Sequence, residues 1–393
     1  MRSSAFLYPW DVVGDPAAPH RLAGLGVQQV TLAAAYHSVR ALTPRHPRTR
    51  IVTARHAAVY YPPDRSRWRG HALRPYEQGW TPGADPFEEA RAALTAAGLE
   101  VHSWVVLAHN SRLGEENPQY TVENAYGERY PWAPCVAQPA VLDYCAELAA
   151  EAAVRPGAAG VELESCGWYG LAHLHAHDKI AGVPLGPAGQ FLMSLCFCAA
   201  CGRGYAEAGA DPAELRAAVR AALEPLWRGG AEPSGGGGTV ADDEWAAVAE
   251  LLGADLAGAA LAHRTAAAYA FQAAAVAAVR AAAGPEFRIL LHADPAVHRS
   301  GPNPGVDVAR VLRVVDGLVV PAARVAEAAA AAGPGASVAA NVGIVTSAGG
   351  RPERPIAPPG ATELRLYHAG LASDEDLRRL AAALRSSPGD GRR

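Results

Sequence analysis

Three cysteines stand within six residues of one another in the segment SLCFCAAC. Cys196, Cys198 and Cys201 are close enough along the chain to share one metal ion. Zinc is commonly held by four ligands in a tetrahedron, and thiolates at such short spacings chelate it without a long loop closure. The fourth ligand then comes from another part of the chain, with Cys135, Cys145 and Cys166 as the candidates. The alternative is that the three cysteines are small apolar residues packed at the start of a helix.

Two carboxylates alternate with apolar residues in the segment AAGVELES. If residues 158–165 form a strand, Glu162 and Glu164 point to the same side of it, toward the interior of a sheet or barrel. Glu164 lies nearer the end of the strand. A carboxyl group buried there has a raised pKa, as a general acid requires. The alternative is that either acid only binds hydroxyl groups or pairs with an arginine.

Polar and aromatic residues also mark the ends of other predicted strands. A mixture of aromatic, imidazole, amide and carboxylate groups is what a sugar site needs, because aromatics cover ring faces and polar groups bind hydroxyls. Asp294 is the best-placed second carboxylate, and a separation of about 6.5–9.5 Å from Glu164 permits inverting hydrolysis. Any single histidine among these residues is more often structural. The remaining strand-end residues are Trp10, Asp11, Tyr36, His37, His109, Asn110, His292, Asn341, Tyr367 and His368.

A histidine-rich segment follows Glu164. In an extended chain, His173, His175 and His177 project to one side and could bind a second metal, although a loop that contacts substrate is the favoured interpretation. Lys179 is the only lysine in a chain with 35 basic residues. It is a candidate for a point-charge contact to a carboxylate or for a Schiff base, and chance retention is the alternative.

Short β-like runs alternate with alanine-rich helical runs along the whole chain. About eight strand–helix units predict a parallel sheet, and their number and length favour a (β/α)8 barrel, in the α/β class, over an open sheet. No Gly-x-Gly-x-x-Gly follows the first strand, which argues against a dinucleotide-binding fold. We expect one TIM-barrel domain over residues 1–393, with an insertion after strand four at 180–254 that carries the cysteines, a helix and a Gly-rich loop. The predicted strands are 4–13, 27–37, 101–110, 158–165, 287–294, 317–321, 337–344 and 363–368, with residues 51–61 as a hairpin or excursion and residues 85–98 as the best-marked helix.

The segment SLCFCAACGRGYAE resembles the Cys-aromatic-Cys-x-x-Cys run of family 42 glycoside hydrolases, β-galactosidases built on a TIM barrel. APCVAQPAVLDYCAELA and GVELESCGWYG resemble two further segments of that family in the same order, so the likeness covers roughly residues 100–205. The resemblance implies a structural zinc site formed by Cys135, Cys196, Cys198 and Cys201, and it implies that Glu164 is the catalytic acid. The family's nucleophile at the end of strand seven is replaced here by Asn341.

The charge balance excludes several classes of partner. With 35 Lys+Arg against 39 Asp+Glu the net charge is −4, whereas a nucleic-acid or anionic-membrane surface needs a basic excess. The N-terminal residues lack the apolar core of a signal peptide, and residues 255–283 contain charges that fit a soluble helix better than a membrane span. We therefore expect a cytoplasmic protein with reduced thiols. The sequence leaves both a monomer and a homo-oligomer open.

These observations together predict a glycoside hydrolase-like barrel that acts on a carbohydrate, with Glu164, Asp294 and Glu162 as catalytic candidates. A first alternative is a carbohydrate-binding barrel without catalysis, because the strand-seven carboxylate is missing. A second alternative is a metal-dependent hydrolase or isomerase that uses the histidine-rich segment.

Overall fold

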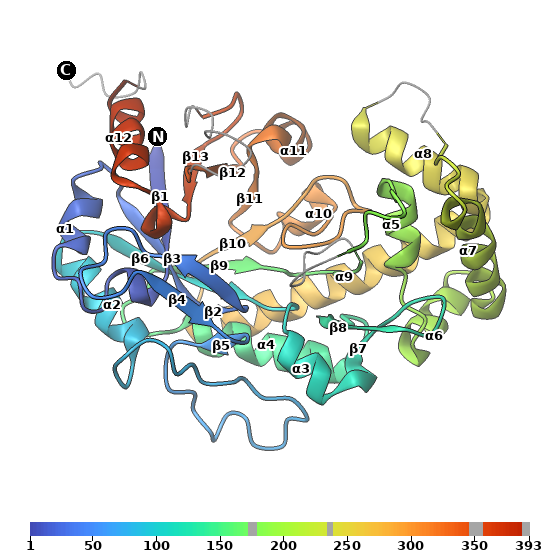
Figure 1. Ribbon diagram of the computed structural model, residues 1–393, viewed down its shortest axis with the longest axis horizontal. Coiled ribbons are helices and arrows are strands. Elements are labelled where there is room, and N and C mark those ends of the chain that lie inside the picture. The colour runs from blue at the N-terminus through green and yellow to red at the C-terminus, as the bar shows by residue number, and fades with distance from the viewer. Residues whose placement is uncertain (172–178, 234–238, 346–356, 387–393) are drawn as a thin grey trace.

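Eight parallel strands close into a barrel in the computed structural model, which describes residues 1–171, 179–233, 239–345 and 357–386 (Figure 1). Each barrel strand pairs with the next barrel strand along the chain. β1 pairs with both β2 and β13, which closes the sheet. The predicted (β/α)8 barrel is therefore confirmed. In barrel order the strands are β1 (Arg2–Leu7), β2 (Gln29–Tyr36), β6 (Glu100–Val106), β9 (Gly160–Glu164), β10 (Arg288–His292), β11 (Gly317–Pro321), β12 (Ser337–Gly343) and β13 (Glu363–Tyr367).

Helices follow the strands and cover the outside of the barrel. The predicted helix at 85–98 is present as α2. The Asp85 side chain caps its start by accepting the Glu88 N–H, and Gly98, with a φ of 83°, lies just after its end. The short helix α10 begins at Val308, where the Asp307 side chain accepts the Arg310 N–H, and it ends at Val311. The outer helices are α1 (Ala18–Ala23), α2 (Pro86–Ala96), α4 (Pro139–Ala153), α9 (Ala254–Ala283), α10 (Val308–Val311), α11 (Val325–Ala332) and α12 (Asp374–Ser386).

Long excursions follow strands two, three and four. The excursion after β2 forms a hairpin of two strands and a short strand that pairs antiparallel with β2, which confirms the expectation for residues 51–61. Those after β6 and β9 lie at one end of the molecule, away from α1 and α12 (Figure 1). The bounds 180–254 for the insertion stay a prediction. The additional elements are η1 (Pro9–Asp11), β3 (Val39–Leu42), β4 (Ile51–Ala54), β5 (Ala58–Val59), α3 (Ser111–Glu116), η2 (Pro118–Tyr120), β7 (Thr121–Glu123), β8 (Arg129–Pro134), α5 (Pro187–Met193), α6 (Ala199–Glu207), α7 (Pro212–Trp227), α8 (Val240–Leu252), η3 (Ala322–Arg324) and η4 (Ala369–Leu371).

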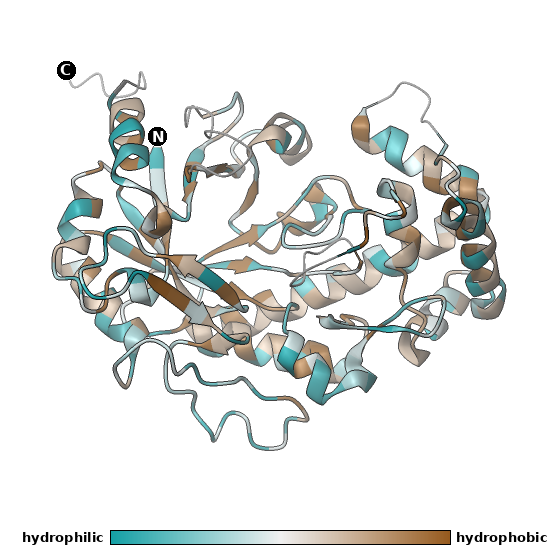
Figure 2. Ribbon diagram, in the orientation of Figure 1, coloured by the Kyte–Doolittle hydropathy of each residue, from teal (hydrophilic) through white to brown (hydrophobic). Residues whose placement is uncertain are grey.

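The long alanine-rich helix α9 meets the length and composition of a membrane span. In the fold it packs against α4, α6 and α8, and it buries His263, Arg264 and Gln272. Two of these side chains bind the barrel loops: Gln272 donates to the Cys166 carbonyl at 2.9 Å, and Arg264 donates to the Ser194 carbonyl at 2.9 Å. These contacts are those of a helix in the outer layer of the barrel. Figure 2 shows the same helix as mostly pale to brown beside the brown barrel strands.

Candidate active site

Glu164 is the last residue of β9 and lies at the carboxyl end of the barrel. Its side chain is buried, with an exposed fraction of 2%, and its Oε2 accepts a 2.7 Å hydrogen bond from the indole of Trp104 on the neighbouring strand β6. Burial raises the pKa of Glu164, although nearby His292 and the Trp104 hydrogen bond act in the opposite direction. A raised carboxyl pKa is the shift that a general acid requires.

Glu162 lies one layer deeper in the barrel and has a different environment. Its Oε1 accepts hydrogen bonds from Arg365 Nε at 2.7 Å and from the Thr31 hydroxyl at 3.1 Å, and both Glu162 and Arg365 are fully buried. Burial alone would raise the pKa of Glu162, but the Arg365 guanidinium and His292 lower it to about 2. Glu162 is therefore a carboxylate held in an ion pair. The pKa values of the two glutamates on one strand are shifted in opposite directions, because Glu162 faces an arginine and Glu164 does not.

This ion pair predicts how the free energy of unfolding depends on pH. Because the folded pKa of Glu162 is about 2 and its ordinary value is 4.5, its stabilisation is complete above pH 4.5 and is lost as the pH falls toward 2. The shift corresponds to about 3 kcal/mol of unfolding free energy. Denaturant titrations between pH 6 and 2 should show this loss in the wild type and a shallower decline in Glu162→Gln. Equal declines in both proteins would contradict the assignment.

His292, at the end of β10, stands between the two glutamates. Its Nε2 is 3.5 Å from Glu162 Oε2, and its Nδ1 is 3.9 Å from Glu164 Oε2. The ring is 1% exposed and packs edge-on against Phe6, with the ring centroids 5.6 Å apart. His292 therefore lies beneath the barrel mouth rather than on its surface.

Aromatic side chains from four strands surround Glu164 at the mouth. Trp104 packs against Tyr36 and Tyr367, with ring centroids 4.5 Å and 5.7 Å away, and Tyr8 stacks on Trp10 at 4.3 Å. Burial raises the pKa values of Tyr36 and Tyr367, and the Glu164 charge raises them further, so both hydroxyls remain protonated. The mouth thus combines apolar ring faces with neutral hydroxyl donors.

Imidazole rings extend this aromatic cluster. His37 stacks on Tyr36 at 4.2 Å and lies 4.8 Å from His109, which itself stacks on Tyr169 at 4.7 Å. His368 stacks on Tyr8 at 5.7 Å, and burial lowers its pKa to about 3, so it is neutral at physiological pH. The structure therefore brings the predicted histidines His37, His109 and His368 together at the carboxyl end of the barrel.

The backbone is strained at two points at the carboxyl end of the barrel. Within the described residues, Ser165 and His368 are the only non-glycine residues with positive φ, at 61° and 63°. Ser165 follows Glu164 directly, and His368 follows the last residue of β13. Left-handed conformations of non-glycine residues cluster at functional sites, where the surrounding structure maintains them. Ser165 is maintained by a hydrogen bond from its N–H to the Pro302 carbonyl and by one between its hydroxyl and Tyr169.

Asp294 lies beyond the end of β10. Leu291 pairs with Leu163, so His292 is level with Glu164 and Asp294 is two residues further toward the mouth. Its Oδ1 accepts the Ala296 N–H at 2.8 Å and contacts Arg324 at 3.3 Å. Asp294 is thus a carboxylate beside an arginine. Asn341 lies on β12, and its Oδ1 is buried without a hydrogen-bond partner among the described residues.

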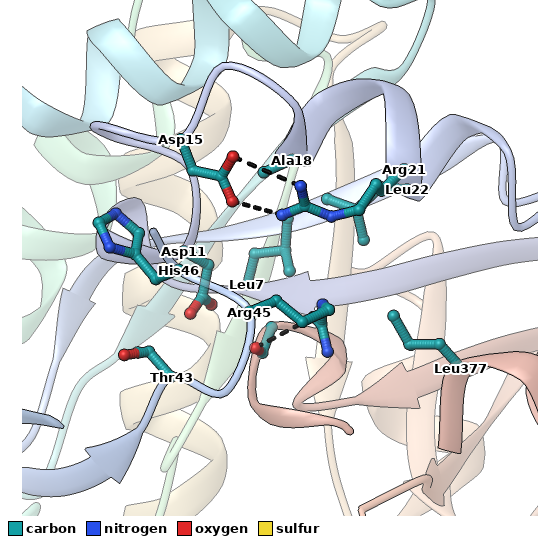
Figure 3. A pocket seen from close by; sticks show the side chains of 11 residues that line it. Leu7, Asp11, Asp15, Ala18, Arg21, Leu22, Thr43, Arg45, His46 and Leu377 are labelled. Carbon is teal, nitrogen blue, oxygen red and sulfur yellow. Dashed lines mark hydrogen bonds and ion pairs between the residues drawn. The ribbon is translucent and has the colours of Figure 1, made fainter. Parts of the chain in front are cut away.

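Asp11 turns away from the barrel mouth. Its Oδ2 accepts the Tyr8 N–H at 2.9 Å, and its carboxyl faces a small cavity that it shares with Arg45 and His46 (Figure 3). Burial raises the pKa of Asp11 to about 7. Gly370 closes the other side, where a Cβ atom would lie 1.9 Å from the Asp11 carboxyl. The structure therefore separates Asp11 from the other predicted site residues.

Three further predictions fall elsewhere. Asn110 caps α3, since its Oδ1 accepts the Leu113 N–H at 3.0 Å. Lys179 is exposed. His173, His175 and His177 lie outside the described residues.

Four cysteines from separate parts of the chain meet beside the barrel. Cys135 follows β8, Cys196 and Cys198 lie between α5 and α6, and Cys201 is in the first turn of α6. The sulfur of Cys135 is 3.7 Å from those of Cys196 and Cys198 and 3.6 Å from that of Cys201, and all four ligand atoms lie within 4.8 Å of one another. Tetrahedral zinc with Zn–S bonds of about 2.3 Å places sulfurs roughly 3.8 Å apart. The cluster is therefore a site that can bind one metal ion, and Cys145 and Cys166 are not part of it.

Two electropositive groups lie against the cluster, whereas hydrogen bonds among the thiols and burial raise the pKa values of Cys135 and Cys201. The Glu123 N–H points at Cys196 Sγ at 3.4 Å, and Cys198 is the N-terminal cap of α6, where the helix dipole favours negative charge. Hydrogen bonds from the other three thiols lower the pKa of Cys198. Arg264 is a buried cation sandwiched between Trp168 and Phe191, with its guanidinium carbon 5.0 Å from each ring, and the cysteine charges raise its pKa against the larger effect of burial.

The sequence reasoning missed several residues of the site. Trp104, Arg365 and Tyr367 hold or surround the two glutamates, yet only Tyr367 was noted, as a strand end. A signal existed: Glu363, Arg365 and Tyr367 alternate with leucines in ELRLY, and an arginine in the middle of a buried strand requires a partner.

The sequence matches no protein-family model and no curated protein. Solved structures of glycoside hydrolases nevertheless share its fold. The catalytic domain of β-amylase from Paenibacillus polymyxa has a TM-score of 0.53 at 12% identity, over 99% of each chain. α-L-fucosidase isoenzyme 2 from Paenibacillus thiaminolyticus has a TM-score of 0.53 at 12% identity, over 97% of this chain and 48% of that one. A GH42 β-galactosidase from G. stearothermophilus has a TM-score of 0.51 at 11% identity, over 97% of this chain and 55% of that one.

The chain thus spans about half the length of the fucosidase and β-galactosidase chains and nearly all of the β-amylase domain. At these identities the likeness shows the fold: a TIM barrel of the kind found in glycoside hydrolases.

Proposed function

We propose that the protein is a glycoside hydrolase-like enzyme that acts on a carbohydrate or glycoside, with Glu164 as the general acid. The observation that carries this proposal is the buried Glu164 carboxyl, which accepts the Trp104 N–H and lies at the aromatic-lined carboxyl end of the barrel. Burial raises its pKa, so it can hold a proton for a leaving group. Active sites of TIM-barrel enzymes lie at this end of the strands.

Asp294 is the proposed base. Its Oδ1 lies 3.3 Å from the Arg324 guanidinium, and a carboxylate at this position can activate a water molecule. The strand-seven position carries Asn341 in place of a carboxylate, which favours an inverting mechanism without a covalent glycosyl intermediate. Glu162 supports the site electrostatically through its ion pair with Arg365.

The substrate is proposed to bind in the aromatic and imidazole cluster of the mouth. Aromatic ring faces bind the apolar faces of sugar rings, and protonated tyrosine hydroxyls donate to sugar oxygens. Trp10, Tyr36, His37, His109, Asn341 and His368 are the proposed contacts, and Lys179 and the segment 173–177 remain candidates from the sequence.

We also propose that the four-cysteine cluster holds structural zinc. Three measured sulfur–sulfur distances of 3.6–3.7 Å match a tetrahedral tetrathiolate site, and zinc prefers such ligands. Bound zinc would supply a cross-link between the excursions after strands three and four. Those excursions also contact each other directly, through the Trp132 indole on the Gly170 carbonyl at 2.9 Å. All six cysteines are free, which fits a reducing compartment such as the cytoplasm.

The test is hydrolysis of a panel of nitrophenyl α- and β-glycosides, with the anomer of the first product read by proton NMR. We expect turnover of at least one glycoside with inversion of configuration. A product of retained configuration would contradict the role given to Asp294. No turnover of any glycoside or oligosaccharide, in a protein that binds none of them, would contradict the proposed function.

A second function is favoured by Asn341. Because an amide stands where the resembled family has its nucleophile, the barrel could bind a saccharide without cleaving it. Equilibrium binding of a sugar by calorimetry, with no product after prolonged incubation, would support this alternative.

A further inference from the structure

The interior of the barrel beneath the mouth buries an unusual number of charged groups. Arg365 pairs with Glu162 and with Glu363, and Glu363 also pairs with Arg288. Two arginines therefore balance two glutamates. The buried His102 pairs separately with Glu100 at 3.0 Å. Glu164 and His292 remain, and both are almost completely buried, with exposed fractions of 2% and 1%.

The buried cluster has no net charge only when Glu164 and His292 together carry one proton. With one proton between Glu164 and His292 the buried cluster is neutral, whether both groups are uncharged or they form an ion pair. With two protons the cluster carries a positive charge, and with none it carries a negative charge. An uncompensated charge inside a protein is costly, so the one-proton state is favoured over a wide pH range.

The geometry places His292 where it can report on both carboxylates. Its Nδ1 is 3.9 Å from Glu164 Oε2, and its Nε2 is 3.5 Å from Glu162 Oε2. His292 Nε2 and Glu162 Oε2 are both buried and face each other, and neither has another hydrogen-bond partner among the described residues. A small approach of the two atoms would satisfy both, which ties the ring to the permanently charged Glu162.

The other groups that face His292 do not share the proton of the Glu164–His292 pair. On β6, Trp104 is a neutral donor, and on β1, Phe6 is apolar. On β13, Arg365 is committed to Glu162 and Glu363, and burial raises the pKa of Tyr367 so that it stays protonated. The remaining ionisable neighbours are Tyr36 on β2, whose pKa is raised by burial, and His102 on β6, which pairs with Glu100 at 3.0 Å.

We propose that a single proton is shared between His292 and Glu164, so that His292 is a positioning residue that controls the protonation of the acid rather than a residue that contacts substrate. The naming of Glu164 as the acid rests on the proposed function, whereas the shared proton rests on the buried charges alone. The titration of each group then depends on the other, and the two apparent pKa values belong to the pair.

The test is a pH titration by NMR of the whole protein labelled with ¹⁵N-histidine. The signal of His292 is assigned as the one missing from His292→Asn, and the exposed His20 is the internal reference. In the wild type we expect His292 to titrate in two steps, with a plateau of partial protonation between them. In Glu164→Gln the upper step should vanish, leaving one step about one to three pH units lower, because the neighbouring negative charge is gone.

Glu164→Asp keeps the charge and should keep the two steps, which separates the loss of charge from a general disturbance of the fold. If His292 titrates in one step at the same pH in the wild type and in Glu164→Gln, the shared proton is disproved. Because the titration needs no substrate, a failure to find glycosidase activity would leave this result standing, and a one-step titration would leave the glycosidase proposal standing.

Discussion

Glu164→Gln is expected to lower kcat/KM for a nitrophenyl glycoside with a poor leaving group by about 10²- to 10⁴-fold. The amide keeps the shape of the carboxyl and can still accept the Trp104 hydrogen bond, so the fold should remain. It has no proton to give to the glycosidic oxygen. The loss therefore measures proton transfer rather than a change of structure.

The leaving group provides the internal check on this prediction. A dinitrophenyl leaving group departs without protonation, so its hydrolysis by Glu164→Gln should fall far less than that of a poor leaving group. Glu224→Gln is the matched control, because it makes the same change at an exposed glutamate of α7. Equal losses for both leaving groups would show that Glu164 is not the acid.

Cys198→Ser is expected to release the bound metal and to lower the free energy of unfolding by on the order of 5 kcal/mol. The sulfur of Cys198 is 3.7 Å from that of Cys135, and it caps the helix that carries Cys201, so its loss opens the tetrahedron. Metal content by mass spectrometry and denaturant titration measure the two effects. A chelator should bring the wild type close to the stability of the variant.

Cys145→Ser is the matched control, because Cys145 is equally buried but lies outside the cluster. We expect it to keep one zinc per chain. Cys198→Ser with undiminished metal would contradict the site. One zinc per chain that survives His175→Ala would argue against a second metal in the histidine-rich segment.

The strand order and the barrel were predictable from the sequence because their signals are local. Each strand is a short apolar run that ends in polar residues, and each is followed by a helical run, so the alternation alone predicts a parallel barrel. The start and the end of α2 are encoded by Asp85, Pro86 and Gly98, which act on the backbone next to them. The expectation that Glu164 is the acid rests on its place at the end of a strand, which is a local feature, and on the resemblance of its segment.

The partners of the site residues were not predictable, because they come from distant strands. Arg365 reaches Glu162 across the barrel, from the last strand to the fourth, and no sequence spacing encodes that contact. The same holds for Asp11, which belongs to a strand end but turns toward Arg45 (Figure 3). The position of a residue along a strand determines the face of the sheet on which its side chain lies. Its charge partner depends on how the sheet closes into a barrel.

The sequence by itself determined the barrel, the strand that carries both glutamates and the cysteine triplet, since each depends on residues near one another in the chain. The residue types alone left Cys135, Cys145 and Cys166 open as the fourth cysteine, the resemblance implied Cys135, and the structure places Cys135 in the cluster. Only the tertiary structure decided that Glu162 is held in an ion pair and that His292 lies between two carboxylates. The physical reason is the same in each case. Ligand sets and buried ion pairs are formed by groups that come together only in the folded chain. Burial then makes the pairing of the charges energetically important.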